Sequence, residues 1–177
     1  MRRTIVMVLK SSKDFTFKDV ELIARHINGK WQSKNRPRII CLYDKALKEY
    51  DFGNIHIIPL KTSLQGTWSR MELYSPYMEK YKPFLYVDLD TAIIESIEKV
   101  FDLVKDESQF ITLEDFWQKN QLATGLVWFP KNCSKTKQAW ERFKQPTGNR
   151  MDYYLRSVLK ADKYFQQLTD GIIDFKP

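Results

Sequence analysis

Residues 84–91 constrain the fold most, because an apolar run there ends abruptly in two carboxylates. Residues 84–87 predict a buried strand, and Asp88 and Asp90 follow it two positions apart. On an extended backbone, side chains at i and i+2 point to the same face, so both acids could bind one cation. Open α/β sheets hold their ligands at the carboxyl ends of their strands. Because paired like charges there repel each other and lose hydration, the pattern predicts a metal site.

The residues around this pair indicate which metal to expect. Oxygen ligands with no neighbouring Cys or His favour Mg²⁺, Mn²⁺ or Ca²⁺ over zinc. Two carboxylates leave positions open for water and phosphate oxygens, and a cation there could neutralise the charge on a departing diphosphate. An Asp-x-Asp alone is common by chance, so a solvated strand end or a helix-capping pair is the alternative interpretation.

The first 43 residues predict a βαβ unit. Residues 4–9 and 38–43 are apolar runs typical of strands buried on both faces. Between them, Thr16 is a candidate N-cap and Gly29 lies where a helix would end, with apolar residues at helical spacing at Val20, Ile23, Ala24 and Ile27. Such a crossover is right-handed almost without exception, so the sheet is at least partly parallel.

The rest of the chain continues the α/β pattern. We expect further strands at 56–60, 84–87, 110–113 and 122–129, and helices at 67–74, 97–104, 134–143 and 151–160. The chain shows no internal repeat, low-complexity tract or linker. A length of 177 residues suits one domain, 1–177.

Charge and composition exclude several classes of protein. The net charge of +7 divides into +7 for residues 1–40, −5 for 41–130 and +5 for 131–177, which suits an acidic metal site that attracts an anionic substrate. The basic residues form no motif that reads nucleic acid, so we expect no nucleic-acid partner. The absence of a membrane-length apolar stretch or a cleavage-site pattern predicts a cytoplasmic protein without a transmembrane segment. Cys41 and Cys133 are expected to be reduced packing residues.

Three motifs in order resemble a known family. They are Gly-Thr-Trp-Ser-Arg-Met-Glu-Leu at 66–73, Phe-Leu-Tyr-Val-Asp-Leu-Asp-Thr at 84–91 and Ala-Thr-Gly-Leu-Val-Trp-Phe at 123–129. Together they resemble the nucleotide-sugar-binding core of GT-A-type glycosyltransferases, in particular the family-8-like branch, over about the first 130 residues. The resemblance implies a single Rossmann-related α/β domain with a mixed, mostly parallel sheet flanked by helices. The late helices from about 131 would complete the sugar and acceptor side.

The resemblance also implies roles for individual residues. Asp88, Leu89 and Asp90 match the family's Asp-x-Asp, whose acids would hold Mn²⁺ or Mg²⁺ against the diphosphate of a UDP-sugar. Arg70 is expected near the phosphates or the donor sugar, where a permanently charged guanidinium can bind two oxygens. Further residues would line the uridine pocket, namely Leu9, Lys10, Ser11 and, more weakly, Asp44. Asp115 and Thr124 would face the sugar, although a solvated loop acid and a strand hydroxyl are their plain alternatives.

Two departures from the family pattern concern the late part of the chain. A Gly-Asp-Gln usually precedes a late helix, whereas the segment 148–152 reads Gly-Asn-Arg-Met-Asp. We expect Asp152 near the sugar, although Asn149 as N-cap with Asp152 at the third helical position would explain it equally well. The His-Gly-x-x-Lys-Pro type tail, which often supplies a third metal ligand, is missing.

The sequence leaves several functions open. The leading prediction is a metal-dependent hexosyltransferase that moves a sugar from a UDP-sugar to a carbohydrate or glycan acceptor, with retention or inversion undecided. Asp115 and Asp152 are the candidate catalytic residues, since inversion needs a base. The alternatives are a phosphohydrolase resembling haloacid dehalogenases and a non-catalytic nucleotide- or carbohydrate-binding module. Trp117 is the best candidate for stacking on a sugar, and the chain could be one module of a larger enzyme or assembly.

Overall fold

A computed structural model describes residues 3–104, 108–146, 148 and 150–169. Within them, eight strands form one sheet in the order β3-β4-β2-β1-β5-β7-β6-β8. The strands are β1 (Thr4–Leu9), β2 (Arg38–Tyr43), β3 (Tyr50–Phe52), β4 (Ile55–Pro59), β5 (Phe84–Val87), β6 (Ile111–Glu114), β7 (Leu122–Phe129) and β8 (Lys163–Tyr164). The sheet is mixed and mostly parallel, as the sequence predicted.

The parallel part of the sheet contains β4, β2, β1 and β5. The chain passes from β1 through helix α1 (Phe17–Lys30) to β2 on one side, and β5 later pairs with the other side of β1. The order of strands therefore reverses between β1 and β5, and such a switch point opens a crevice at the carboxyl ends of the strands. β7 is antiparallel to β5, and β6 is antiparallel to β7, so β6 also points its carboxyl end to this edge.

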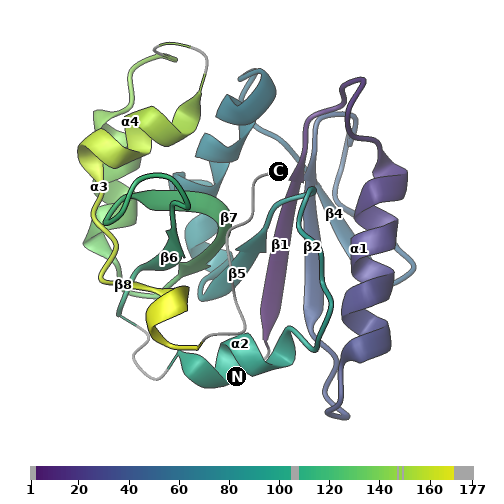
Figure 1. Ribbon diagram of the computed structural model, residues 1–177. Coiled ribbons are helices and arrows are strands. Elements are labelled where there is room, and N and C mark those ends of the chain that lie inside the picture. Colours follow the sequence, from purple (N-terminus) through teal and green to yellow (C-terminus); the bar gives the residue numbers. More distant parts are fainter. Residues whose placement is uncertain (1–2, 105–107, 147, 149, 170–177) are drawn as a thin grey trace.

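Helices cover both faces of the sheet, because alternate side chains of each strand point to opposite sides. Ile5, Met7 and Leu9 of β1 pack with α1 and the short helix α2 (Glu98–Leu103). Val6 and Val8 lie in a second core. That core is covered by the 3₁₀ helices η1 (Gly66–Tyr74) and η2 (Pro76–Tyr81) and by α3 (Ser134–Arg142) and α4 (Met151–Val158) (Figure 1).

The structure corrects several expectations about local structure. Gly29 lies inside the last turn of α1, and the helix ends at the extended residue Trp31. Residues 66–74 form a 3₁₀ helix. Four short elements were not anticipated, namely β3, η2, β8 and η3 (Phe165–Gln167). Thr16 does cap α1, with Asp19 completing a reciprocal pair of capping bonds.

No helix in the described ranges combines the length and the apolar character that a membrane span requires. Cys41 is buried and Cys133 half-buried, and both are free thiols, as expected.

Phe129 should be a major source of stability, because its ring contacts those of Tyr74, Phe84 and Phe110 in the second core. Phe129→Ala is expected to lower the free energy of unfolding by about 3–5 kcal/mol, since it removes a buried ring and leaves a cavity. Urea denaturation measures this. The matched control is Phe52→Ala in the edge strand β3, whose half-exposed side chain should lose about 1 kcal/mol or less. Equal losses in the two variants would contradict the assigned core.

Candidate functional site

The ends of β1 and β2 are joined by one carboxylate. Asp44 accepts hydrogen bonds from the Ser11 amide at 3.0 Å and the Ser11 hydroxyl at 2.8 Å, and Lys10 Nζ lies 3.5 Å from its other oxygen. Burial opposes the ionisation of Asp44, but these donors outweigh it and hold its pKa below the ordinary value. Leu9 is buried, and its carbonyl oxygen accepts a hydrogen bond from the Asp44 amide at 3.3 Å. The four residues assigned to uridine binding therefore lie together at the carboxyl edge, and uridine binding itself stays a prediction.

Asp88 lies where β5 ends, next to β1 across the switch point. Its amide donates to Gly125 O of β7 at 2.9 Å. One carboxylate oxygen accepts bonds from the Tyr86 hydroxyl at 2.9 Å and the Leu89 amide at 3.0 Å, and the other pairs with Arg70. Tyr86 is buried, which raises the pKa of its hydroxyl well above the ordinary value, so it remains a proton donor to Asp88.

The segment after Asp88 differs from the extended backbone that we expected. The Thr91 amide donates to Asp88 O at 3.2 Å, which closes a tight turn over residues 88–91. Leu89 packs into the first core, while Asp90 is exposed on the turn. The two acids therefore belong to a turn, and the alternation of a strand does not explain their relative orientation.

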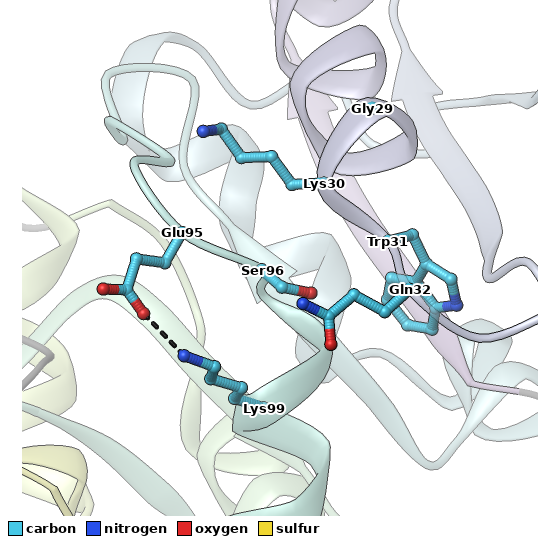
Figure 2. A pocket seen from close by; sticks show the side chains of 7 residues that line it. All are labelled: Gly29, Lys30, Trp31, Gln32, Glu95, Ser96 and Lys99. Atoms are coloured by element: carbon cyan, nitrogen blue, oxygen red, sulfur yellow. Dashed lines mark hydrogen bonds and ion pairs between the residues drawn. The ribbon is translucent and has the colours of Figure 1, made fainter.

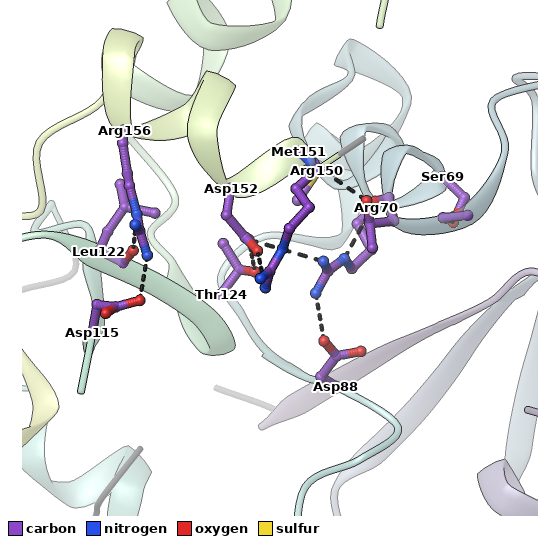
Figure 3. Close-up of polar contacts among 12 residues, drawn as sticks. Ser69, Arg70, Asp88, Asp115, Leu122, Thr124, Arg150, Met151, Asp152 and Arg156 are labelled. Carbon is purple, nitrogen blue, oxygen red and sulfur yellow. Dashed lines mark hydrogen bonds and ion pairs between the residues drawn. The ribbon is translucent and has the colours of Figure 1, made fainter. Parts of the chain in front are cut away.

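Arg70 is the central cation of the site. Its side chain extends from η1, is nine-tenths buried, pairs with Asp88 and lies 3.9 Å from Asp152 Oδ1 (Figure 3). Its Nε donates to Thr67 O at 3.3 Å. Burial opposes the charged guanidinium, but the nearby anionic groups, Asp88 foremost, outweigh it and keep the pKa of Arg70 above its ordinary value. A cation held between two carboxylates at the switch point is placed to bind an anion that enters the crevice.

Asp152 brings α4 to the same edge. It accepts a hydrogen bond from the Thr124 hydroxyl of β7, and Arg150 Nη2 lies 3.2 Å from its second oxygen. The predicted capping arrangement is wrong, because Arg150 caps α4 and Asp152 is the second helical residue. Asn149 lies outside the described residues. Asp152 still complements the helix dipole from the first turn, but its side chain is directed to β7 and Arg70.

Asp115 follows β6 and has a partner that the sequence analysis missed. One oxygen accepts bonds from the Trp117 and Gln118 amides, both at 2.9 Å, and the other pairs with Arg156 of α4. Arg156 also donates to Leu122 O at 3.0 Å. Burial opposes the ionisation of Asp115, but the Trp117 amide, Arg156 and the Gln118 amide outweigh it and hold its pKa below the ordinary value. Arg156 lies four residues after Asp152, and this helical spacing is the signal that could have revealed it.

The residues of this edge enclose a small pocket. Its volume is about 100 Å³, and its lining comprises Asp115, Trp117, Gln118, Arg150, Asp152, Tyr153 and Arg156. Trp68 and Trp128 are buried in the cores, and Trp140 packs on Phe143.

A larger hollow of about 460 Å³ lies at the opposite, amino end of the strands, between the end of α1 and the start of α2 (Figure 2). Its two lysines already have partners, since Lys99 pairs with Glu95 and Lys30 donates to Ile94 O, both at 2.8 Å. None of the candidate site residues lines it. We therefore place the functional site at the carboxyl edge, where the smaller pocket lies.

Oxygen ligands for a cation are present at this edge, although the described residues contain no cluster of three His, Cys, Asp or Glu side chains around one point. Asp88 and Asp90 supply hard carboxylate oxygens. Mg²⁺ is often bound by one or two carboxylates together with substrate phosphates and water. A cation held by Asp88 and Asp90 would therefore have to be completed by a phosphorylated ligand and water, and it would compete with Arg70 for Asp88.

Comparisons with known proteins agree with this architecture. No protein-family profile and no curated protein sequence matches the chain. Among solved structures, an active-site mutant of LgtC matches with a TM-score of 0.61 and 14% identity, over 91% of this chain and 72% of that one. GlyE of Streptococcus pneumoniae TIGR4 matches with a TM-score of 0.59 and 12% identity, over 94% of this chain and 46% of that one.

The chain has the GT-A-type glycosyltransferase fold. A third match is the galactosyltransferase LgtC in complex with donor and acceptor sugar analogues, with a TM-score of 0.58 and 13% identity. The chain spans less than half the length of GlyE. The fold expectation is confirmed, while the family-8-like branch and the residue roles stay predictions.

The contact between Arg156 and Asp115 gives a prediction about pH. Because the folded-state pKa of Asp115 is depressed, its ionised form contributes stability that is present above the ordinary carboxyl pKa and is lost as the pH falls through the depressed value. Arg156→Met should lower the free energy of unfolding by about 1–3 kcal/mol at neutral pH, and the difference from wild type should shrink below about pH 4.

Urea denaturation between pH 3 and 8 tests this, with Arg142→Met on the exposed side of α3 as control. A loss in Arg156→Met that does not change with pH would show that the side chain stabilises the fold by packing alone.

Proposed function

We propose that the chain is a metal-dependent glycosyltransferase that moves a sugar from a UDP-sugar to an acceptor hydroxyl. The observation that carries the proposal is Arg70, which lies buried between Asp88 and Asp152 at the switch point of a glycosyltransferase fold. One structure with the same fold, LgtC, was determined with donor and acceptor sugar analogues. Other functions of the acid pair, such as phosphate ester hydrolysis, receive no comparable support from the fold.

The donor would extend across the carboxyl ends of β1, β2 and β5. Lys10, Ser11 and Asp44 would hold the nucleoside, with Leu9 as the apolar floor. Arg70 would bind phosphate oxygens, for which its forked donors are suited. Thr124, Asp152 and Asp115 would then face the sugar, because they lie on β7, on α4 and directly after β6, beyond Arg70.

Asp88 and Asp90 would hold Mn²⁺ or Mg²⁺. When bound, such a cation supplies electrostatic stabilisation of the charge that develops on the leaving diphosphate. The negative charge of Asp88 is balanced by the positive charge of Arg70 in the described structure. A diphosphate bound to Arg70 would neutralise the positive charge of the guanidinium and leave a carboxylate oxygen of Asp88 for the cation. The charges of these two side chains would therefore favour joint binding of nucleotide and metal.

Asp115, one of the two candidate catalytic acids, is poorly suited to act as a general base. Its pKa is held below the ordinary value, and both its oxygens are engaged with Arg156 and two amides. A general base works best with a pKa near the working pH. Asp115 is therefore better suited to orienting a sugar hydroxyl. Both oxygens of Asp152 are also engaged, with Thr124 and Arg150, so a role of Asp152 as base in an inverting reaction would require the release of one of these contacts.

Turnover of a panel of UDP-sugars tests the proposal. With Mn²⁺, the wild-type protein should release UDP from at least one of UDP-glucose, UDP-galactose and UDP-N-acetylglucosamine, and EDTA should abolish the release. Asp90→Asn should reduce the rate roughly a hundredfold or more, because it removes a ligand charge from the metal. Since Asp90 is exposed, the variant should fold normally.

The matched control is Asp51→Asn in the edge strand β3, which should keep the wild-type rate. Hydrolysis of a generic phosphate ester without any turnover of UDP-sugars would overturn the proposal in favour of a phosphohydrolase. UDP binding without turnover of any sugar in the panel, with or without added saccharides, would instead indicate a binding module.

A further inference from the structure

Tyr86 lies two residues before Asp88, in the middle of the sheet. It pairs with Val6 of β1 on one side and with Val127 of β7 on the other. The Asp88 amide continues the pairing with β7, since it donates to Gly125 O at 2.9 Å. On an extended backbone, side chains two residues apart point to the same face. Tyr86 and Asp88 therefore both face the layer that contains η1.

Packing holds the Tyr86 side chain in one position. Its exposed fraction is 1%, and its ring lies in the second core together with Met71 and Tyr74 of η1. Close-packed protein interiors leave a ring of this size little room to move. The hydroxyl therefore stays directed at Asp88, whose Oδ1 accepts its hydrogen bond at 2.9 Å.

The two carboxylate oxygens of Asp88 differ in their partners. A carboxylate oxygen offers about two lone-pair sites. Oδ1 accepts from the Tyr86 hydroxyl and from the Leu89 amide, the latter at 3.0 Å, so both of its sites are used. Among the described residues, Oδ2 has one hydrogen-bond partner, Arg70. The site that remains on Oδ2 adjoins the positive guanidinium, which repels a metal cation.

These partners decide how a cation can reach Asp88. Because both sites of Oδ1 are used, a cation must bind Oδ2, the oxygen that Arg70 holds. An anion that pairs with Arg70 removes this obstacle. Without the Tyr86 hydroxyl, Oδ1 would have an open site, and a cation could bind there while Arg70 stayed on Oδ2.

We propose that Tyr86 is a positioning residue that makes cation binding at Asp88 depend on an anionic ligand. Its hydroxyl acts through Asp88, because it occupies Oδ1 and leaves the cation only the oxygen that Arg70 holds. The inference rests on the proposed function, since it takes Asp88 as a metal ligand and a diphosphate as the anion. It goes beyond that function by assigning the dependence to one hydroxyl group outside the Asp-x-Asp pair.

Tyr86→Phe tests the proposal, because it removes one oxygen atom and keeps the ring. Two roles of the hydroxyl make opposite predictions for this variant. If the hydroxyl only held Asp88 in place, its loss would weaken Mn²⁺ binding both with and without UDP. If it occupies Oδ1 as proposed, its loss should strengthen the binding of Mn²⁺ alone.

The signal of free Mn²⁺ in electron paramagnetic resonance measures these affinities on the full chain. Mn²⁺ is titrated into wild type and Tyr86→Phe, without UDP and with saturating UDP. The Kd for Mn²⁺ alone should fall about fivefold or more in the variant, and the Kd with UDP should stay within about twofold of wild type. The gain in affinity that UDP gives should therefore fall to less than about half of its wild-type value.

Tyr81→Phe is the matched control. Tyr81 is also a buried tyrosine of the second core, but its hydroxyl donates to Glu49 at 3.4 Å, so the variant should keep the wild-type affinities. Thermal melting checks that both variants fold. Titration of UDP with and without Mn²⁺ must give the same gain in each protein, because the coupling between two ligands is reciprocal.

The outcomes separate this inference from the proposed function. If wild type shows the gain from UDP and Tyr86→Phe either keeps that gain or binds Mn²⁺ more weakly in both conditions, the inference is wrong and the proposed function stands. Independent binding of UDP and Mn²⁺ by wild type would also overturn the inference, since there would be no dependence for Tyr86 to impose. A wild type that binds no Mn²⁺ in either condition would remove the metal-dependent function, and the inference with it.

Discussion

The ion pair between Arg70 and Asp88 joins the parts of the molecule on which the site depends. Arg70 comes from η1, which covers one face of the sheet, and Asp88 from the end of β5. Asp152 of α4 approaches the same guanidinium. Removing one member of a buried pair is costly, because the remaining charge loses its partner away from water. The pair therefore fixes how helices from two segments sit over the carboxyl edge.

The same pair is also a functional constraint. The half-buried carboxylate of Asp88 is stabilised by the Arg70 guanidinium without a metal, so a cation that binds Asp88 would have to compete with Arg70 unless an anion occupies the guanidinium. Tyr86, with its raised pKa, keeps donating to Asp88 and holds the carboxylate in one orientation. Under the proposed function, this arrangement would favour a ligand that brings negative charge with it, such as a diphosphate.

The strands whose side chains are buried on both faces of the sheet were predicted well from the sequence. Residues 4–9, 38–43 and 122–129 are mostly apolar, with Thr124 and Gly125 inside the last run, and they form β1, β2 and β7 with the expected bounds. Elements that tertiary contacts create were not predictable: β3 is an exposed three-residue strand, and β8 has only two residues. Gly29 lacks a positive φ and continues α1, although its type suggested a helix end.

The sequence predicted which residues belong to the candidate site better than it predicted which of them contact each other. The topology brings the carboxyl ends of β1, β2, β5 and β6 together at one edge of the sheet. The predicted site residues therefore lie at this edge, namely Lys10, Ser11, Asp44, Arg70, Asp88, Thr124, Asp115 and Asp152. The turn after Asp88 depends on a backbone hydrogen bond that no side-chain pattern encodes. The spacing of Arg156 after Asp152 could have indicated Arg156 as a residue of this edge. Its pairing with Asp115, which joins a hairpin loop to a helix 41 residues later, is visible only in the assembled fold.

The central claim is that the carboxyl edge binds a diphosphate and a divalent cation together. Isothermal titration of Mn²⁺ into the protein, with and without saturating UDP, tests it most directly. The account predicts weak binding of Mn²⁺ alone, binding at least about tenfold tighter with UDP, and loss of that gain in Asp90→Asn. UDP and Mn²⁺ that bind independently of each other, or a gain that Asp90→Asn leaves intact, would contradict it.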